Sequence, residues 1–364
     1  MGKQALVTGA NGITGSAILD HLLKDPANKD WEKVVATSFS AQHYKSDDSR
    51  LQYLALDFTK DVESLKAAMG SACAGVTHAY FSSYVDRPNF EELRPANEML
   101  FQNFLSALVA VAPKLESVTL QTGGKVWYYG GHLAPTVVPQ VEEQARSDFD
   151  ADNFYYPQED YLKEQQKGQN WTWNVIRPEG ITGFTPRPSG MNWALAFAVY
   201  FLICKELGIE AKAPTNQIYW NTADDASDAR QIGALSVWAS TTPRCANQAF
   251  NSTNGDYFVW RYMWPRLAGW FGAEARSDQT FEKGVPKEGE VQQEMSLAEW
   301  TKDKKPVWER LCDKAGVPEA KPTFDSVSWF IVDWSRKFGW TGHVDSYDSF
   351  VHAFESFRNA KQIP

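Results

Sequence analysis

Positive charge is in deficit in this sequence of 364 residues, which has 36 Lys and Arg against 45 Asp and Glu and a formal net charge of −9 at pH 7. Binding to nucleic acid without sequence preference needs a basic face. The longest basic run, KDKK at residues 302–305, is short and is typical of a solvated helix or loop. We therefore expect no nucleic-acid partner.

Cysteine and histidine are also scarce, with four Cys and six His in the whole chain. The cysteines show neither CxxC spacing nor Cys/His ligand spacing, which excludes the usual patterns of a disulfide framework or a zinc site. We expect reduced thiols, a cytoplasmic location and no metal. The cysteines are Cys73, Cys204, Cys245 and Cys312.

Long apolar runs are missing as well. The longest, WALAFAVYFLIC at residues 193–204, is too short to span a bilayer and predicts a buried helix, so we expect no membrane partner. The chain starts MGKQALVTG, which predicts a strand almost at once and leaves no room for a leader peptide.

What the first half does contain is an alternation of short β-rich runs with amphipathic stretches, the pattern of a parallel sheet covered by helices on both faces. The expected strands are Gln4–Thr8, Lys33–Ser38, Tyr53–Leu56, Val76–Ser82, Ser117–Gln121 and Trp171–Ile176. The expected helices are Ile13–Leu23, Val62–Ala68, Ala96–Ala110 and Tyr156–Gln166.

After Pro178 this rhythm changes to Pro/Gly clusters, helices and isolated strands. We predict an α/β fold with a doubly wound parallel sheet in residues 1–180 and a smaller, mainly helical substrate-binding lobe in residues 181–364. The two parts are expected to interleave, because Asn247–Ser252 has the pattern of a late sheet strand.

A glycine-rich loop follows the first predicted strand in ALVTGANGITGSAI, where Gly9, Gly12 and Gly15 are spaced G-x-x-G-x-x-G. The first glycine permits a tight turn, the second allows backbone to approach a pyrophosphate, and the third allows the helix to pack on the strand. The helix start then offers free N–H groups and a positive dipole to phosphate. In this strand–turn–helix context the loop predicts a Rossmann-type dinucleotide site.

Two further strand ends bear on the cofactor. Asp57 directly follows the third strand, where related folds direct a carboxylate to the adenine, although a helix cap is the alternative. The second strand ends TSFSAQ and has neither the acid typical of NAD enzymes nor the base typical of NADP enzymes. Thr37, Ser38 and Ser40 are candidate ribose or phosphate contacts, and His43 and Lys45 are candidates for a 2′-phosphate.

Short-chain reductases commonly pair Tyr and Lys as Tyr-x-x-x-Lys on one helix, where the cation lowers the pKa of a phenol that otherwise titrates near about 10. That pair is absent: Tyr155 and Tyr156 are followed four residues later by Glu159 and Asp160. Lys125, just beyond the fifth strand in LQTGGK, is the candidate replacement, and an exposed loop lysine is the alternative.

Several segments together resemble the progesterone 5β-reductase/iridoid synthase family of extended short-chain dehydrogenases/reductases. They are LQTGGK, NFYYPQED, RPEGITGF, SDAR (227–230), FNSTNGDYFVW (250–260) and KPVWE (305–309), and they extend over nearly the whole chain. The resemblance implies reduction of activated C=C bonds of enones and enals with NADPH. It implies Lys125 and Tyr155 as catalytic residues, with the phenol stabilising an enolate oxygen.

The residues expected at the cofactor are Gly9, Asn11, Gly12, Ile13, Thr14, Gly15, Ser38, Asp57, Phe58 and Thr122. Tyr84, Trp127 and Asn192 are the candidates for the substrate pocket. Asn192 is equally suited to capping the helix that follows it.

The chain departs from the family at three places. Phe39 and Ser40 stand where the family has two adjacent Arg for the 2′-phosphate, so the expected cofactor is NADP(H) or NAD(H) without a fixed preference. Tyr84 replaces a common pocket Trp. The stretch SWFIVDWSRKFGWTGHVD at residues 328–345 is shorter than the family segment that helps to cap the substrate.

The leading hypothesis is an NAD(P)H-dependent reductase of a small-molecule enone or enal, of secondary-metabolite type, with a homodimer left open. A non-redox isomerase, cyclase or aldol-type enzyme on the same scaffold is the alternative. A nucleotide-sensing regulator of the NmrA type is the third hypothesis, and the retained pair of Tyr155 and Lys125 argues against it.

Overall fold

A parallel sheet of seven strands organises the protein, seen in a computed structural model that describes residues 2–87, 90–123, 141–146, 153–189, 192–285, 293–327 and 346–364. Across the sheet the order is β10-β6-β5-β4-β1-β2-β3, and every neighbouring pair is parallel. The strands are β1 (Lys3–Val7), β2 (Trp31–Ser38), β3 (Leu51–Ala55), β4 (His78–Phe81), β5 (Ser117–Gln121), β6 (Thr172–Pro178) and β10 (Gln248–Ser252).

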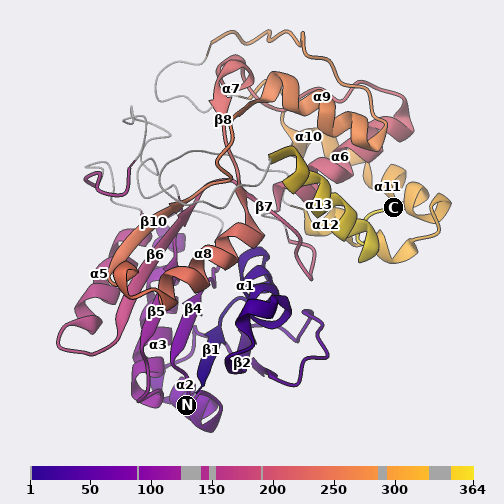
Figure 1. The fold of residues 1–364 in the computed structure, drawn as a ribbon. Coiled ribbons are helices and arrows are strands. Elements are labelled where there is room, and N and C mark those ends of the chain that lie inside the picture. Colours follow the sequence, from indigo (N-terminus) through magenta and orange to yellow (C-terminus); the bar gives the residue numbers. More distant parts are fainter. Residues whose placement is uncertain are drawn as a thin grey trace.

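Helices cover both faces of this sheet (Figure 1), as expected for parallel strands that bury side chains on both sides. On one face, α1 (Ile13–Lys24) and α8 (Ala229–Thr241) pack together over side chains such as Val7 and Ile176. Helices α2 (Val62–Cys73), α3 (Phe90–Val111) and α5 (Tyr155–Gln166) cover the other face, against Leu6 and Val118. The alternation of Leu6 and Val7 between two cores follows from the two-residue period of a strand.

A second group of helices lies beyond the carboxyl ends of the strands, in the upper part of Figure 1. At its centre is α6 (Trp193–Leu207), in which Ala194 through Cys204 are all buried, as the apolar run predicted. Packed around it are α9 (Trp260–Phe271), α11 (Lys305–Lys314) and α13 (Ser346–Asn359). The short helices are α7 (Gln217–Asn221), α10 (Leu297–Trp300) and α12 (Thr323–Ser326), with 3₁₀ turns at Pro26–Asn28, Pro243–Cys245, Thr301–Asp303 and Pro318–Ala320.

Two small strand pairs connect this helical group to the sheet. Strand β7 (Ile181–Thr182) pairs in parallel with β9 (Ser227–Asp228), and β8 (Ala223–Asp224) pairs antiparallel with β11 (Phe258–Val259). The Asp228 carboxylate caps α8 and also accepts a hydrogen bond from Ser349 Oγ of α13 at 2.7 Å. The two helical layers are therefore joined through buried polar contacts.

The predicted α/β fold with a doubly wound parallel sheet is confirmed. Each predicted strand and helix exists, β5 with its predicted bounds and the others with one or both ends shifted. The largest shifts are in α3, which begins six residues before the predicted Ala96, and α2, which ends five residues beyond the predicted Ala68. Strand β10, the late strand expected at residues 247–252, completes the edge beside β6. Residues after 180 thus contribute a strand and a covering helix to the sheet.

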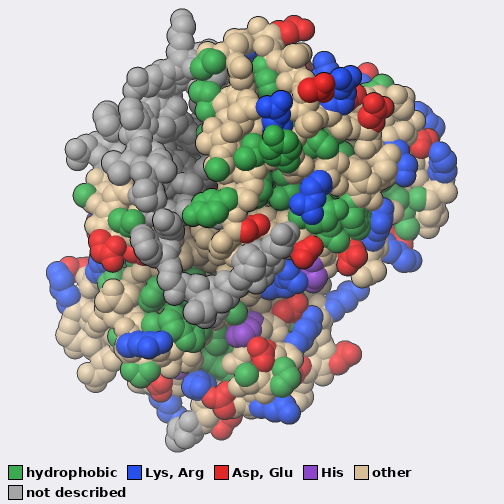
Figure 2. Space-filling view, turned by 45° about the horizontal axis from the view of Figure 1, so that its top comes forward, with side chains coloured by type: hydrophobic (Ala, Val, Ile, Leu, Met, Phe, Trp, Pro, Cys, Tyr) green, Lys and Arg blue, Asp and Glu red, His purple; other side chains and the backbone are tan. Residues whose placement is uncertain are grey.

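On the face shown in Figure 2, acidic and basic side chains are interspersed over the surface that is coloured by type. Within the described ranges, no helix combines the length and the apolar character that crossing a membrane requires. The same residues contain no group of three or more His, Cys, Asp or Glu side chains arranged to hold a metal ion. All four cysteines are buried and free.

Gly15→Ala should destabilise the fold, because a Cβ at this position would overlap the backbone carbonyl of Gly9. Backbone cannot move as a flexible side chain can, so we expect a loss of about 1–3 kcal/mol in the free energy of unfolding, measured by urea denaturation. Gly269→Ala in α9 is the matched control, because nothing lies within 4 Å of its added Cβ. Equal effects of the two substitutions would contradict the assigned packing role of Gly15.

Candidate functional site

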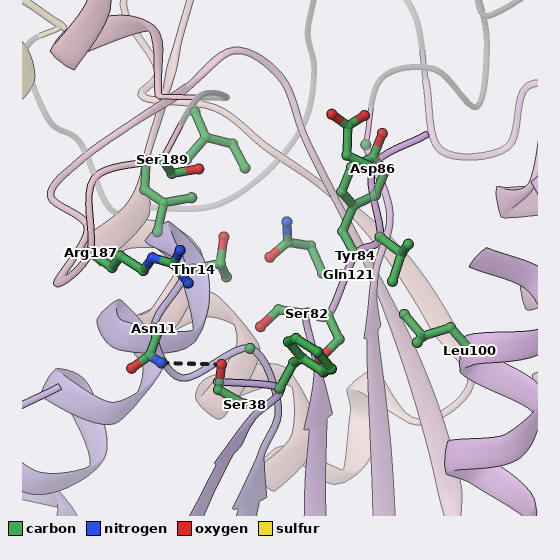
Figure 3. A pocket seen from close by; sticks show the side chains of 18 of the residues that line it. Asn11, Thr14, Ser38, Ser82, Tyr84, Asp86, Leu100, Gln121, Arg187 and Ser189 are labelled. Carbon is green, nitrogen blue, oxygen red and sulfur yellow. Dashed lines mark hydrogen bonds between the residues drawn. The ribbon is translucent and has the colours of Figure 1, made fainter. Parts of the chain in front are cut away.

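A cavity of about 1430 Å³ opens at the carboxyl edge of the sheet, where the loops that follow β1 to β6 converge (Figure 3). Typical small-molecule sites occupy about 300–1,000 Å³. The cavity therefore has room for a dinucleotide together with a substrate.

The glycine turn forms the wall of this cavity after β1. Gly9 has φ +66°, and a Cβ there would lie 2.7 Å from the carbonyl oxygen of Ser82, so both its conformation and its surroundings require glycine. Gly9 and Gly12 line the cavity, whereas Gly15 lies behind them and allows α1 to approach the turn. The tight turn at Gly9 and the close helix approach at Gly15 are as predicted, and the approach of Gly12 to a pyrophosphate stays a prediction.

The N-terminus of α1 faces the cavity without a side-chain cap. Gly12 is its N-cap residue and provides no side-chain hydrogen bond, and the first turn holds no acidic residue. Thr14 is buried, lines the cavity, and its Oγ1 has no hydrogen-bond partner among the described residues. Helix N–H groups and an orphaned hydroxyl at one place form a site suited to phosphate.

Asn11 has a role that the sequence did not predict. Its Nδ2 donates to the Ser40 Oγ at 3.0 Å and the Ala41 carbonyl at 2.8 Å, with the Ser38 Oγ at 3.3 Å, a contact that Figure 3 shows. Its Oδ1 accepts from the His43 N–H at 2.8 Å. Asn11 lines the cavity, and its side chain holds the connection after β2 in place.

That connection presents Ser38, Phe39 and Ser40 to the cavity. Phe39 is 78% exposed, and neither His43 nor Lys45 is among the lining residues. Arg87 and Arg187 are the basic residues that line the cavity within the described part of the chain. The wall after β2 therefore offers hydroxyl groups and an aromatic ring in place of a pair of guanidinium groups.

After β3, Asp57 and Phe58 line the cavity side by side. The Asp57 Oδ1 accepts hydrogen bonds from the N–H of Thr59 at 3.0 Å and from its hydroxyl at 2.6 Å. The N-cap of the following α2 is Asp61, so the alternative of a helix cap does not describe Asp57.

Tyr155 stands at the start of α5 with its side chain in the cavity wall. Its hydroxyl oxygen lies 3.2 Å from the point that a Cβ on Gly123 would occupy, just beyond the carboxyl end of β5. Glycine at position 123 therefore leaves room for the phenol at this edge of the sheet.

A buried ion pair fixes the helix that carries Tyr155. Glu159, four residues after Tyr155, is 1% exposed, and its carboxylate lies 3.0 and 3.3 Å from the guanidinium of Arg177 on β6. Asp160 pairs with Arg146 through two bonds of 2.9 and 2.8 Å. Glu159 thus anchors α5 to the sheet, Asp160 ties the same helix to the loop that carries Arg146, and the usual Tyr-x-x-x-Lys position is used for structure.

The remaining predicted residues are distributed as follows. Lys125 and Trp127 lie outside the described residues, so their expected roles stay predictions. Thr122 and Tyr84 line the cavity, and Tyr84 packs against Phe154 at 5.9 Å between ring centroids. Burial, with a smaller contribution from Asp86, raises the pKa of Tyr84 to about 12.

Asn192 is not among the lining residues. Its Oδ1 accepts from the N–H of Leu195 and its Nδ2 donates to the Gly183 carbonyl, so it caps α6, which is the alternative that the sequence left open. Its neighbour Trp193 lines the cavity instead.

Several polar residues of the cavity were not predicted, among them Gln121, Glu179 and Arg187. Gln121 ends β5, and its Oε1 is buried without a hydrogen-bond partner in the described part of the chain. The sequence signal for it was its place at a strand's carboxyl end, where ligands of such sheets bind. Glu179 follows β6, and Arg187 lies in the β7–α6 connection. No local pattern distinguishes Arg187 from an ordinary loop residue.

The residues present fit a dinucleotide. Glycines border the turn where a Cβ would intrude, the uncapped α1 N-terminus faces the cavity, and Thr14, Gln121 and Thr122 have buried oxygen atoms without hydrogen-bond partners among the described residues. A family profile described as a PRISE-like Rossmann-fold domain matches residues 5–364. The chain belongs to this PRISE-like family. The resemblance seen in the sequence is confirmed.

Curated relatives of this PRISE-like protein include enzymes that match it over nearly the whole chain. The short chain dehydrogenase gsfE of Penicillium aethiopicum is 50% identical, with 100% of both chains covered. An (S)-8-oxocitronellyl enol synthase of Nepeta racemosa is 31% identical over 99% of this chain and 93% of its own. A 3-oxo-Δ(4,5)-steroid 5-β-reductase of Arabidopsis thaliana is 30% identical with the same coverage. This protein is therefore an enzyme of the short-chain dehydrogenase/reductase type.

Solved structures show the same fold at low identity. The Bordetella bronchiseptica enzyme WbmG, determined in complex with NAD and UDP, superposes with a TM-score of 0.64 and 14% identity, with 100% of this chain and 97% of that one covered. The likeness confirms the Rossmann fold of this PRISE-like protein.

A group of acids lies behind one end of the cavity. Glu179 lines it, and the buried Asp224 and Asp225 lie on the following β8 segment, with the Asp225 N–H donating to Asp224 Oδ1 at 2.8 Å. Burial raises the pKa of Asp224 well above the usual range of Asp, and the charges of Asp225 and Glu179 raise it further. A neutral carboxyl is thus favoured at position 224.

Asp224→Asn should stabilise the PRISE-like protein increasingly as the pH rises. The folded pKa of Asp224 is raised, so wild-type stability falls as pH increases from the unfolded value of about 3.9 toward the folded one, at up to about 1.4 kcal/mol per pH unit. The amide of Asn does not titrate, so the stability of the variant lacks this pH dependence. We expect the difference in Tm between variant and wild type to grow as the pH rises above the unfolded pKa of about 4, whereas Asn at the exposed Asp278 should show no such growth above about pH 5. A difference independent of pH would contradict this assignment.

Proposed function

We propose that this protein is a nicotinamide-nucleotide-dependent reductase of the activated C=C bond of an enone or enal, with Tyr155 as the residue that stabilises charge on the carbonyl oxygen. The observation that carries the proposal is that Tyr155 and the glycine turn border one cavity, with the phenol at the carboxyl end of β5. The names of the relatives, a dehydrogenase, an enol synthase and an enone-type steroid reductase, support the same class of chemistry.

The cofactor that fits is NAD(H) or NADP(H). Gly9, Gly12 and the α1 N-terminus would hold the diphosphate, and Asp57 and Phe58 would border the adenine, as their places in the cavity wall support. When bound, the reduced nucleotide supplies a hydride to the β-carbon of the substrate. The likeness to WbmG, whose structure was determined in complex with NAD, supports a nicotinamide nucleotide as the cofactor.

The protein contributes to this reaction mainly by stabilising negative charge on the carbonyl oxygen. The Tyr155 hydroxyl donates a hydrogen bond to the carbonyl oxygen, on which negative charge develops as the β-carbon is reduced, and the α-carbon then takes a proton from water. A preformed donor of this kind stabilises the transition state more than the ground state. Lys125 is proposed as the cation beside the phenol. The Tyr84 and Trp193 rings would form an apolar wall for the substrate.

The substrate is proposed to be a small molecule, in a cytoplasmic protein that binds neither nucleic acid nor a membrane. The net charge of −9 and the interspersed surface charges of Figure 2 support the absence of a nucleic-acid partner. A homodimer is compatible with this proposal.

Tyr155→Phe tests the reaction directly. We expect the rate of nicotinamide oxidation with a simple enone such as 2-cyclohexen-1-one to fall by about 100-fold or more, because one donor to the developing oxyanion is lost. The dissociation constant of the nucleotide should stay nearly unchanged. Absorbance at the nicotinamide band measures the rate, and fluorescence titration measures binding.

The matched control is Tyr161→Phe on the same helix, whose hydroxyl bonds to the Ser106 hydroxyl at 2.6 Å and does not line the cavity. It should retain activity. Wild-type protein that binds nucleotide but oxidises none across a panel of enones would refute the reductase proposal and favour the isomerase or cyclase alternative.

Cofactor preference follows from the residues after β2. Because Phe39 and Ser40 offer no guanidinium group, we expect NADPH to bind less than about 100-fold more tightly than NADH, the preference that two charge-assisted phosphate contacts could supply. Competitive titration of both nucleotides gives the ratio, and Ser40→Arg should shift it toward NADPH. A much larger ratio in the wild type would mean that another cation reaches the 2′-phosphate.

A further inference from the structure

Arg187 is a cation of the cavity wall whose position no contact with the described residues explains. It lies in the connection between β7 and α6, is exposed, and takes part in no hydrogen bond or ion pair within the described ranges. Most other arginines of the same part of the chain are paired, for example Arg177 with Glu159 and Arg50 with Asp48. Figure 3 shows the guanidinium beside Thr14, on the Asn11 side of the cavity.

The N-terminal end of α1, which borders the same cavity as Arg187, also carries positive potential. The α1 N-terminus, with Gly12 as an N-cap residue that gives no side-chain bond and no acid in the first turn, presents N–H groups and the positive end of the helix dipole. The buried Thr14 Oγ1 has no hydrogen-bond partner in the described ranges. A guanidinium and a positive helix end that border one cavity, with no carboxylate of the described residues within ion-pair distance of the guanidinium, together attract an anion that binds between them.

We propose that Arg187 binds the diphosphate of the nucleotide from the side opposite the α1 N-terminus, and that this contact replaces the affinity that a pair of arginines after β2 would supply. The inference rests on the proposed nucleotide-dependent function. A guanidinium donates two parallel hydrogen bonds to phosphate oxygens, which suits a bridging diphosphate better than a single point charge does.

The position of Arg187 favours the diphosphate over a 2′-phosphate. A 2′-phosphate belongs beside the end of β2, at Ser38 to Ser40, where the Ser38 and Ser40 hydroxyl oxygens accept hydrogen bonds from the Asn11 amide and no guanidinium group is present. Arg187 and Thr14, which is in the first turn of α1, line the same cavity, and in the view of Figure 3 the guanidinium points toward Thr14. The contact would therefore be common to NADH and NADPH and would not select between them.

The Arg187→Gln variant tests the proposed diphosphate contact through measurements of nucleotide binding, without any assay of activity. We expect the dissociation constants of NADH, NADPH and ADP-ribose to rise by the same factor, about tenfold to a hundredfold, because one charge-assisted contact is lost. ADP-ribose contains the diphosphate but neither nicotinamide nor a 2′-phosphate, so its response isolates the contact. Arg187→Lys, which keeps the charge but not the planar fork, should lose less. Isothermal titration at several salt concentrations should also give a smaller salt dependence for Arg187→Gln than for the wild type.

The matched control is Arg276→Gln, an exposed arginine that pairs with Asp278 and does not line the cavity; it should bind all three ligands as the wild type does. Thermal melting checks that each variant is folded. Loss of NADPH affinity alone would assign Arg187 to the 2′-phosphate and overturn the proposal, as would unchanged affinity for all three ligands. Failure of the wild type to bind any of them would refute the nucleotide-dependent function itself.

Discussion

The close contact between the glycine turn and α1 determines where everything else in this protein lies. Gly15 lets the helix approach the Gly9 carbonyl, and Gly233 of α8 in turn lies against the Ala17 backbone of α1, where an added Cβ would be 2.8 Å from the carbonyl oxygen. From α8, Asp228 reaches Ser349 of α13. Backbone contact at two glycines thus joins the sheet, its covering helices and the helical group that closes the cavity.

The same contact brings a helix N-terminus to the edge of the sheet, and the cavity becomes electrically polarised. Arg187 and the α1 N-terminus make the end near Thr14 positive, whereas Glu179 stands in another part of the wall, with the buried Asp224 and Asp225 behind it. Positive charge faces the expected diphosphate, and the carboxyl groups lie elsewhere, with the pKa of Asp224 raised by its burial and by the charges beside it. A polar cofactor can therefore be oriented before any substrate contact is made.

Tyr155 is positioned by a buried ion pair, and removing its two charged groups from water costs free energy. Burial of Glu159 and Arg177 removes both charges from water, and such a pair contributes stability only when its geometry is good. Here the pair spans α5 and β6, so it fixes the helix start relative to the sheet edge. The acid that occupies the usual lysine position of a short-chain reductase therefore serves the packing of α5 on the sheet.

Strand and helix placement was predictable because it depends on local periodicity, and the glycine turn was predictable because positive φ and close approach demand one residue type. The roles of individual side chains were less predictable from the sequence. Asn192 was expected either in the pocket or as a helix cap, and the structure shows the cap, a contact that the local pattern encodes. Asn11 was expected at the nucleotide and also holds the loop after β2, through partners about thirty residues away that no local pattern encodes.

The sequence by itself determined the fold class, the nucleotide loop and the family, because each depends on residue types at short, fixed spacing. Only the tertiary structure decided which side chains share the cavity. Gln121, Glu179 and Arg187 come from three different connections and meet because parallel strands direct their carboxyl ends to one edge. The pairing of Glu159 with Arg177 was likewise decided by the packing of α5 on β6, since a buried charge must find its partner wherever the fold brings one.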